Sequence, residues 1–551
     1  MNQLLYRAVR GLSRHLNVTN KNWIGTDDEN IAFFDERHPS TCFDAIWYRK
    51  KYSAEIGSNE DAWGHYVRVG SQLKFDPCEY FWPEWYLERN PDVAAASLNP
   101  LMHFEQYGAM ECRDPSPLFQ TGWYARTYNL DPKVCNPLSD FLKRGRGLGY
   151  APRADLVVKS FMQGASNAGH ASSLVDQIEW KLEHAGHSAL YEAVLATGRS
   201  YYTSKALDIT EQPFLQEIAN EMQSQGVVKV GPPYSIIMDN VVIIPGSMFL
   251  AKESMLINDE VANLPPGSSL KLWDRTWRRG NNILLRYTVG LNPRIETGIH
   301  LFKEYEQNYF HFVAEVLPKL LCYERLGLDV SIPLLVSSDL DERLYELIEM
   351  FKHPQRTVLK LERNVPYLVA KLYYISDLSL VSDVYDRPPV ASDTYLSGTL
   401  LNDIAVQALS KRTTPSVIRR RRKIFITRHG KRRKIVNEPE IVDALIRQGF
   451  EVIDLSNLSV MSQVELFSSA DVIVGGTGAG FTNLLWCLPG TKAVILYPIH
   501  PFSNTTFWDR IAAVRKLNID YIYGVRANVV DGIHSMHDDF TIDLEELNDA
   551  L

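Results

Sequence analysis

The sequence has little cysteine and no long apolar run. Its six cysteines in 551 residues are too few for a disulfide scaffold. They form no C-x-x-C pair, so a structural zinc site is not expected. A reducing compartment is therefore expected. Because no run of about 18 apolar residues occurs, the sequence predicts no membrane-spanning helix. Apolar residues make up 45% of the chain, and Gly and Pro show no short period, which excludes disorder, collagen and coiled coil for the whole chain.

Basic residues are not in excess overall. The chain has 58 Lys and Arg against 66 Asp and Glu, a formal net charge of −8, which argues against a general nucleic-acid-binding protein. The charge is uneven, because residues 411–434 contain 12 Lys or Arg and no acid.

Residues 1–41 form an N-terminal segment with a predicted amphipathic basic helix. The apolar residues between positions 4 and 16 fall on one helical stripe, and three arginines lie off it. This pattern suits a helix on an anionic membrane surface and equally a helix docked on its own protein. We expect a cytoplasmic protein, with peripheral attachment to the inner face of the cytoplasmic membrane as one use of this helix.

Residues 42–153 carry an internal repeat. A Trp-Tyr pair recurs twice at a spacing of 38 residues, and three further markers keep the same phase. The markers are Trp47-Tyr48, Trp85-Tyr86 and Trp123-Tyr124; His65, His103 and Asp140; Gly70, Gly108 and Gly145; and Pro77, Pro115 and Pro152. This period predicts three stacked helical hairpins, with Gly70 just past the end of a helix. The module is expected to bind or position a partner.

The remaining chain predicts two α/β lobes, at 154–328 and 329–551. In the second lobe, strands are expected at 423–427, 450–455, 471–475 and 492–497, with helices at 437–448, 459–470 and 481–487. This alternation is typical of a doubly wound parallel sheet. Strands at 332–338, 357–361 and 368–376 are expected to extend the same lobe.

A glycine-rich loop, Gly475-Gly476-Thr477-Gly478-Ala479-Gly480, follows the strand at 471–475. Backbone N–H groups and a helix N-terminus would meet there at the carboxyl edge of the sheet, which suits a phosphate group. The loop is not a P-loop, because no Gly-Lys-Ser/Thr follows, and it lacks the third glycine of the dinucleotide fingerprint. A tight structural turn is the alternative.

Cations follow the strand at 423–427, at the same edge of the sheet. Arg428, Arg432, Arg433 and Lys434 would converge with the loop amides, an arrangement that suits a diphosphate. A solvated charged face and nucleic-acid binding through 419–423 and 431–434 are the alternatives. We expect no nucleic-acid partner, because the run straddles a strand and the remaining chain is acidic.

A second group of polar residues lies at helical spacing. Asn308, His311 and Glu315 are at i, i+3 and i+7, on one face of a predicted helix. A His and a carboxylate one turn apart can act as a general base and its orienting partner, although a core histidine is the alternative. Pro318 lacks an N–H, so the carbonyl of Ala314 loses its helical partner and a bend is expected.

Two motifs have the spacing of metal ligands. Asp339 and Asp341 form a D-x-D pattern, but they open a predicted helix with Asp339 at the N-cap and Glu342 at N3, so we interpret them as a cap. His534 and His537 lie in an acidic tail and are not interpreted as ligands. We expect no metal and no cofactor.

Three segments together resemble glycosyltransferase family 61, which includes bacterial capsular polysaccharide biosynthesis enzymes and eukaryotic xylosyl- and N-acetylglucosaminyltransferases. They are NYFHFVAEVLPKL (308–320), ITRHGKRRKIVNEPEIV (426–442) and VIVGGTGAGFTNLLWCLPGTKAVILYP (472–498). The ending HDDFTIDLEEL (537–547) is also similar. The resemblance covers roughly 225–551, and the repeats look like an accessory module found beside bacterial polysaccharide glycosyltransferases.

The resemblance implies a two-lobed GT-B fold made of two Rossmann-like lobes, with the acceptor on the 154–328 side and the donor on the 329–551 side. It implies inverting transfer, without an obligatory metal, from a nucleotide-sugar donor to a saccharide or lipid-linked saccharide acceptor in capsule or other surface-polysaccharide synthesis. We expect a UDP-linked donor. A non-catalytic scaffold with a degenerate glycosyltransferase domain is the alternative.

Candidate site residues follow from the motifs and the resemblance together. His311 or Glu315 would be the catalytic base, with Asn308 supporting the helix face and Glu304 and Glu306 as other nearby carboxylates. The donor would be bound by Arg428, Arg433, Lys434, Gly476, Thr477, Gly478, Ala479, Gly480, Thr482 and Asn483. Many family members have His where this chain has Thr477.

Overall fold

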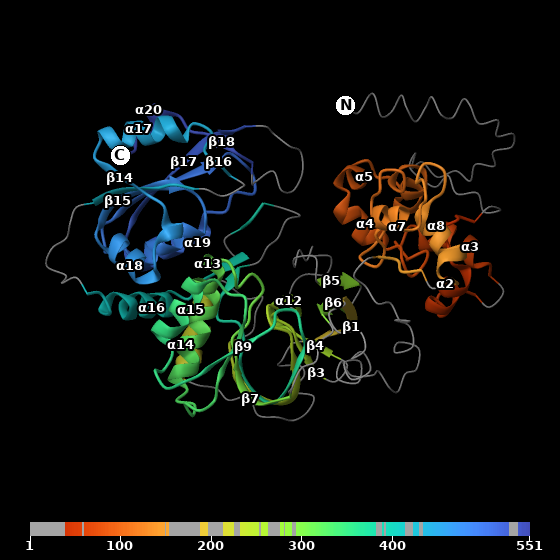
Figure 1. The fold of residues 1–551 in the computed structure, drawn as a ribbon, viewed down its shortest axis with the longest axis horizontal. Coiled ribbons are helices and arrows are strands. Elements are labelled where there is room, and N and C mark those ends of the chain that lie inside the picture. The colour runs from red at the N-terminus through yellow and green to blue at the C-terminus, as the bar shows by residue number, and fades with distance from the viewer. Residues whose placement is uncertain are drawn as a thin grey trace. The chain divides into compact units, whose positions relative to one another are not determined.

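The computed structural model describes residues 39–57, 60–148, 150–153, 188–196, 213–224, 232–252, 255–262, 276–279, 282–288, 294–381, 388–390, 393–413, 422–428, 433–527 and 538–551. The helix expected at 4–16, Arg432, His534 and His537 lie outside these residues. The chain divides into two compact units, Met1–Ala154 and Asp155–Leu551 (Figure 1). Within the described ranges, no helix combines the length and apolar character needed to cross a bilayer.

The first unit is helical. Its elements are α2 (Ala45–Lys51), α3 (Ala62–His65), η1 (Tyr66–Gly70), α4 (Pro83–Arg89), α5 (Pro91–Ala95), α6 (Pro100–His103), η2 (Phe104–Gly108), α7 (Thr121–Thr127), α8 (Pro137–Asp140) and η3 (Phe141–Gly145), where η1, η2 and η3 are π-helical turns. An equivalent hydrogen bond occurs three times along this unit. The tyrosine hydroxyl is 3.0 Å from the ring nitrogen in Tyr48–His65, 2.9 Å in Tyr86–His103, and 2.9 Å from the carboxylate in Tyr124–Asp140.

Close approach, not backbone conformation, explains the glycines that follow these pairs. Gly70 was expected just past a helix end, but it and its two equivalents are the last residues of the π-helical turns, and none has a positive φ. In each case a Cβ would overlap a tyrosine hydroxyl. The pairs are Gly70 with Tyr48, Gly108 with Tyr86, and Gly145 with Tyr124. The glycines therefore leave room for the buried tyrosines.

The second unit contains a ten-stranded sheet that bends like part of a barrel (Figure 1). Its strand order is β5-β6-β1-β4-β3-β2-β10-β7-β8-β9. The strands are β1 (Ser188–Ala196), β2 (Ser235–Ile243), β3 (Leu250–Lys252), β4 (Met255–Ile257), β5 (Thr276–Arg279), β6 (Asn282–Thr288), β7 (Ile295–His300), β8 (Leu334–Ser337), β9 (Val358–Leu361) and β10 (Tyr367–Ile375). Pairing is mixed, since β10 is antiparallel to β2 and parallel to β7. This differs from the Rossmann-like first lobe that we expected.

The prediction that the strands at 332–338, 357–361 and 368–376 extend the C-terminal lobe was wrong. They form β8, β9 and β10, and β8 pairs in parallel with both β7 and β9. Apolar runs identify strands, but the partner strand is decided by packing between distant segments, which periodicity does not report. The change from one main sheet to the other falls after β10, not at residue 328.

The second main sheet has six strands in the order β14-β13-β15-β16-β17-β18. Its elements are β13 (Arg422–Ile426), α17 (Glu438–Arg447), β14 (Phe450–Ile453), α18 (Val460–Ser468), β15 (Ala470–Gly476), β16 (Lys492–Pro498), α19 (Thr506–Arg515), β17 (Asn518–Arg526), β18 (Phe540–Thr541) and α20 (Leu544–Asp549). All pairs are parallel except β17 with β18. The four strands predicted between 423 and 497 are confirmed. Together the two sheets make a mixed α/β fold.

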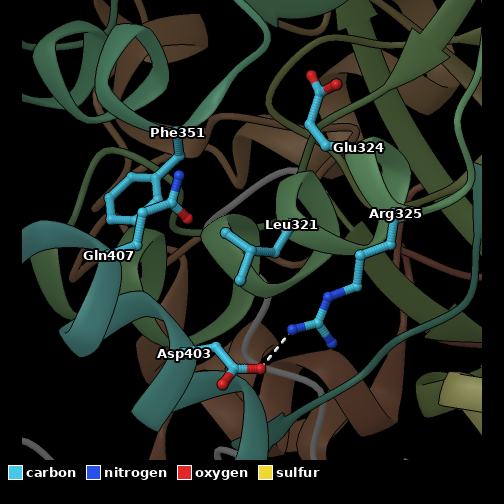
Figure 2. Close-up of a pocket in the computed structure, with 6 residues that line it drawn as sticks. All are labelled: Leu321, Glu324, Arg325, Phe351, Asp403 and Gln407. Atoms are coloured by element: carbon cyan, nitrogen blue, oxygen red, sulfur yellow. Dashed lines mark hydrogen bonds and ion pairs between the residues drawn. The ribbon is translucent and has the colours of Figure 1, made fainter.

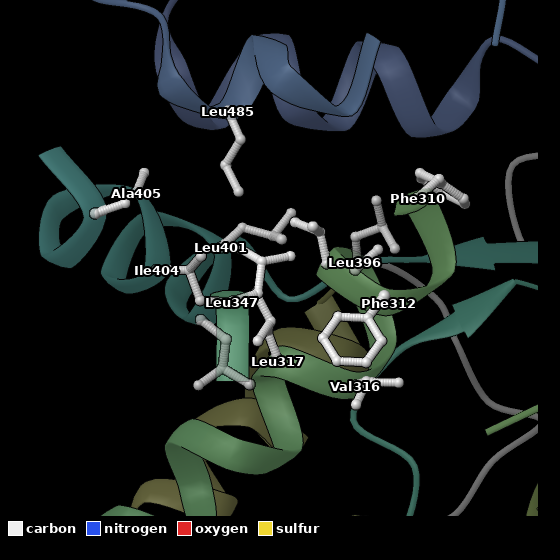
Figure 3. Packing of buried hydrophobic residues seen from close by; sticks show 14 of the residues in the cluster. Phe310, Phe312, Val316, Leu317, Leu347, Leu396, Leu401, Ile404, Ala405 and Leu485 are labelled. Carbon is white, nitrogen blue, oxygen red and sulfur yellow. The ribbon is translucent and has the colours of Figure 1, made fainter. Parts of the chain in front are cut away.

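One apolar core joins the helices of both sheets. It includes α13 (Tyr309–His311), the π-helical turn η6 (Phe312–Val316), α14 (Leu317–Arg325), α15 (Glu342–Phe351) and α16 (Gly398–Ser410), packed against α18, α19 and the segment after β15. Figure 3 shows Phe312 and Leu317 in this core together with Leu401 of α16 and Leu485 of the segment after β15. Burying each such side chain stabilises the fold by about 1.5–3 kcal/mol. This core holds the segment that carries His311 against the second sheet.

The expected break at Pro318 takes the form of a change in helix type. The π-helical turn η6 ends at Val316, and Pro318 lies in the first turn of α14. The carbonyl of Ala314 accepts a hydrogen bond from the Ser379 hydroxyl at 2.7 Å, in a buried position. A side chain from a distant segment therefore replaces the helical N–H that proline lacks.

Replacing Ser379 with alanine is expected to lower the free energy of unfolding by about 1–3 kcal/mol, because the Ala314 carbonyl would stay buried without this partner. Urea unfolding of the variant measures the change. Ser410→Ala is the matched control, since that exposed hydroxyl donates only to the carbonyl of Gln407 at the end of α16. Equal stability of the wild type and Ser379→Ala would contradict the role of the hydroxyl.

Candidate functional site

The strand order of the second sheet creates a position for a ligand. The parallel part has the order β14-β13-β15-β16-β17, so β14 lies on one side of β13 and β15 lies on the other. The connection after β13 therefore covers one face through α17, whereas the connection after β15 packs on the other face. In such sheets ligands bind outside the carboxyl ends of the strands at this switch point. Arg428 follows β13 there, and the glycine-rich loop follows β15.

Arg428 contacts the glycine-rich loop directly. Its Nη1 donates to the carbonyl of Thr477, and a Cβ on Gly478 would overlap the same nitrogen. Burial and the neighbouring Arg433 lower the pKa of Arg428 to about 10, so the group stays cationic at neutral pH. The Asp539 carboxylate acts in the opposite direction and raises this pKa in part. Two positive charges at this position attract an anion more strongly than one. The site is therefore electrostatically prepared for a negatively charged group.

Arg433 is held in a strained backbone conformation. Its φ of 56° lies in the left-handed region, which costs a non-glycine residue about 1–3 kcal/mol and is typical of functional sites. The adjoining segment is fixed by the C-terminus: the Lys434 N–H donates to Asp539 Oδ1 at 2.7 Å, and Ile435 pairs with Phe540. The Lys434 side chain is exposed. Arg428 and Arg433 thus form the cationic pair, and no described contact places Lys434 with them.

The loop after β15 opens a 3₁₀ helix, η9 (Ala479–Trp486), where the sequence predicts a helix over 481–487. Gly476 ends β15, and the N–H of Thr477 donates to the Leu496 carbonyl at 2.9 Å, which holds the loop against β16. Ala479 and Gly480 are the first residues of η9, and a helix leaves its first N–H groups without partners inside the helix. These amides and the two arginines lie at one sheet edge and suit an anion.

Thr482 and Asn483, which were predicted to line the donor pocket, lie in the segment that packs into the apolar core. Both are completely buried. Asn483 Oδ1 accepts from the Tyr309 hydroxyl at 2.9 Å and from Trp486 Nε1 at 2.8 Å, while its Nδ2 donates to Gln463 Oε1 at 2.8 Å. Asn483 therefore links the glycine-rich segment to α13.

His311 and Glu315 meet as predicted from their spacing. His311 Nδ1 lies 2.6 Å from Glu315 Oε2, and the exposed fraction is 15% for the His311 side chain and 4% for that of Glu315. The ring of Tyr305 stacks on His311 at 5.3 Å, and Tyr305 has a left-handed φ of 62°. Asn308 does not support this face; it caps α13 by accepting from the Phe310 N–H at 2.9 Å.

The His311–Glu315 pair has the geometry of a base and its orienting partner. Burial raises the pKa of Glu315, but Lys303 and His311 lower it by more. The pKa is therefore below that of an ordinary glutamate, and the carboxyl is ionised at neutral pH. An ionised Glu315 accepts a hydrogen bond from the Nδ1–H group, so the lone pair of the neutral His311 ring lies on Nε2. The packing of Phe310 on Trp508, with ring centroids 5.5 Å apart, fixes this helix against the second sheet.

Glu306, another nearby carboxylate, accepts from the Lys303 N–H at 3.1 Å and also contacts Ser337 and Arg363. Glu306 accepts from the Ser337 hydroxyl and from Arg363 Nη2, and burial raises its pKa to about 7. Arg363 Nε also donates to Asp339 at 2.8 Å. The predicted cap was therefore assigned to the wrong aspartate: Asp341 caps α15, and Asp339 is engaged by an arginine. Glu304 is buried as well. No group of three or more metal-ligating side chains occurs in the part of the chain that the structure describes.

A cavity of about 290 Å³ lies among α14, α15 and α16 (Figure 2). Its lining consists of Leu321, Glu324, Arg325, Phe351, Asp403 and Gln407, with an ion pair between Arg325 and Asp403. None of the predicted site residues lines this cavity. The cavity is therefore not part of the candidate site.

Sequence analysis missed the buried charges behind Glu315. Lys303 Nζ lies 3.3 Å from Glu315 Oε1 and 3.4 Å from Asp377 Oδ1, and Lys319 Nζ lies 2.7 Å from the same Asp377 oxygen. All four side chains are almost completely buried. Isolated Lys and Asp residues carry no spacing signal, and lysine is rarely expected inside a protein.

A comparison with protein families gives one match. Residues 309–494 match the model of the family described as Glycosyltransferase 61, a range that includes the His311–Glu315 pair, Arg428, Arg433 and the glycine-rich loop. No curated protein matches the chain. The family indicates a glycosyltransferase, an enzyme that uses a sugar donor and an acceptor. The chain is thus similar to glycosyltransferase family 61 over residues 309–494.

Proposed function

We propose that the protein is an inverting glycosyltransferase that takes its sugar from a nucleoside-diphosphate sugar, of the UDP-linked type. The observation that carries this proposal is the contact of Arg428 with Thr477 and Gly478, next to Arg433, at the switch point of a parallel sheet. An anion with two negative phosphate groups matches two adjacent guanidinium groups and the amides that open η9.

In the proposed reaction these groups stabilise the leaving diphosphate. When the bond between the anomeric carbon and the phosphate oxygen breaks, its electron pair moves onto the diphosphate. Arg428, Arg433 and the N–H groups of Ala479 and Gly480 would bind this added charge. Because donors fixed in advance need no reorganisation, they lower the barrier more than water does.

The His311–Glu315 pair would activate the acceptor. Nε2 of His311 accepts the proton of the acceptor hydroxyl, and the oxygen attacks the anomeric carbon from the side opposite the diphosphate, which inverts its configuration. Glu315 stabilises the imidazolium that forms, at the 2.6 Å contact with Nδ1. The acceptor proposed here is a saccharide or a lipid-linked saccharide.

We further propose a setting in capsule or other surface-polysaccharide synthesis, at the inner face of the cytoplasmic membrane. In this proposal, the helical unit at 42–153, with its three equivalent tyrosine contacts, binds a partner protein, and residues 4–16 contact the membrane surface. Nucleic acid is not a proposed partner.

Activity is expected to survive EDTA, because the two aspartates of the D-x-D pattern have structural partners: Asp341 caps α15 and Asp339 pairs with Arg363. Transfer by the intact protein should proceed at an unchanged rate after chelation and gel filtration. Loss of activity in EDTA with recovery on addition of Mn²⁺ would contradict this reading of the two aspartates.

A thermal-shift series tests the donor site. Nucleoside diphosphates and nucleoside-diphosphate sugars should raise the Tm of the intact protein, since a ligand that binds only the folded state stabilises it, whereas the matching nucleosides should not. A panel in which no diphosphate raises the Tm more than its nucleoside would contradict the proposed site.

A further inference from the structure

The His311–Glu315 pair lies at the end of a buried chain of charges. From His311 Nδ1 the contacts run to Glu315 at 2.6 Å, on to Lys303 at 3.3 Å, to Asp377 at 3.4 Å and to Lys319 at 2.7 Å. The four inner side chains are 3–4% exposed, and only His311, at 15%, reaches the surface. They come from the loop after β7, from η6, from α14 and from the segment after β10.

The inner part of this chain is balanced in charge. Two lysines face two carboxylates, and burial would raise the pKa of Asp377, but Lys303 and Lys319 lower it by more. His300, also buried in this region, has its pKa lowered to about 3 by burial and by Lys319, so it is neutral at physiological pH. A proton taken up by His311 therefore adds one charge to a balanced set.

Burying four charges is expensive, and a well-packed apolar set of similar volume is often as stable. Stability alone therefore does not explain why the chain keeps this network behind a partly exposed histidine. A low-dielectric interior strengthens the effect of each charge on the pair, which gives the network a direct influence on proton uptake.

We propose that Lys303, Asp377 and Lys319 are positioning residues that set the protonation of the His311–Glu315 pair. Lys303 holds Glu315 as a carboxylate aimed at Nδ1, and Asp377, held by Lys319, fixes Lys303 in place. This inference rests on the proposed role of His311 as the base, but the coupling between the charges is measurable without any transfer activity.

The proposal predicts opposite shifts from removing opposite charges. Lys303→Met leaves the cluster with a net negative charge, so the pair takes up its proton at higher pH, whichever member carries it. Asp377→Asn leaves a net positive charge, so the pair takes up its proton at lower pH. Each shift is expected to be about 1 pH unit, the scale of a nearby buried charge.

The direct readout is NMR titration of the His311 ring in intact protein labelled at histidine, with the signal assigned by its loss in His311→Gln. The acid limb of the pH–kcat profile should move in the same directions, because activity requires the unprotonated pair. Glu306 lies close by, with its carboxylate accepting from the Lys303 N–H, and burial raises its pKa to about 7, so it also titrates within the pH–kcat profile. The NMR signal of His311 therefore separates the titration of the pair from that of Glu306. The other groups near the network, the buried Glu304 and the Tyr374 ring that Lys319 contacts, are present in both variants.

Glu324→Gln is the control, because Glu324 lies five residues after Lys319 on α14 and its ion pair is with the buried Arg356, not with a residue of this chain of charges. It should lower stability without moving the His311 titration. Should Lys303→Met fail to fold, Lys319→Met replaces it, with a smaller upward shift because Lys319 acts through Asp377. Shifts of the same sign in the lysine and aspartate variants, or no shift in either, would overturn the proposal. If the opposite shifts occur and no sugar is transferred, the network stands and the proposed function fails.

Discussion

Replacing Arg428 with alanine is expected to weaken binding of a nucleoside diphosphate by about 1.5–3 kcal/mol, the scale of a hydrogen bond to a charged group. The guanidinium is mostly buried against Gly478 and the Thr477 carbonyl, so its removal takes away a cation that is already fixed in place. Isothermal titration of the intact protein with a nucleoside diphosphate measures the loss. Affinity for the parent nucleoside should be unchanged.

The same strand provides the matched control for this variant. Arg422 lies at the opposite end of β13, where it pairs with Glu451 at the surface. Arg422→Ala removes the same charge from the molecule but not from the switch point, so diphosphate affinity should stay near the wild-type value. Equal losses in the two variants would mean that net charge, and not the crevice, determines binding.

Replacing His311 with alanine is expected to lower kcat by about 10²–10⁴-fold, the usual contribution of a general base. Diphosphate affinity should be unaffected, because His311 lies on α13 and the cations lie after β13. Steady-state transfer kinetics and titration of the donor separate these two effects. His353→Ala is the control, since this histidine lies in a turn after α15 and its ring Nδ1 accepts from the N–H of Gln355. A His311→Ala variant with wild-type kcat would remove the pair from the reaction.

Local sequence signals predicted the second sheet well. The strands β15 and β16 are apolar runs that end at Gly476 and Pro498, and the helix after Asn437 ends before Gly449, whose φ is 83°. The position of Arg428 and the glycine-rich loop also followed from sequence, because residues after parallel strands must share one edge of the sheet.

The features that sequence analysis missed depend on contacts between distant segments. The strands at 334–337, 358–361 and 367–375 look like members of any parallel sheet, and only their pairing with β7 and β2 assigns them to the first one. Asn483 lies within the resembling segment, yet its partner Tyr309 is 174 positions away in the chain. Likewise, nothing in the sequence around Lys303 or Asp377 indicates that both are buried together.

The glycines show a related difficulty. Gly478 suits a phosphate-binding loop, but its backbone is extended, with φ 166°, and a Cβ there would displace the Arg428 guanidinium from its present position. Gly70, Gly108 and Gly145 likewise make room for tyrosines. A glycine in a sequence indicates either a special backbone conformation or a close neighbour, and the choice between them needs the structure.

The most direct test of the account is release of nucleoside diphosphate from nucleoside-diphosphate sugars by the intact protein, with and without saccharide acceptors, compared with Arg428→Ala and Arg422→Ala. The account predicts that at least one donor is turned over faster with an acceptor present, that Arg428→Ala loses this turnover, and that Arg422→Ala keeps it. Turnover that is equal in wild type and Arg428→Ala, or a folded wild-type protein that neither binds nor turns over any nucleoside-diphosphate sugar, would contradict it.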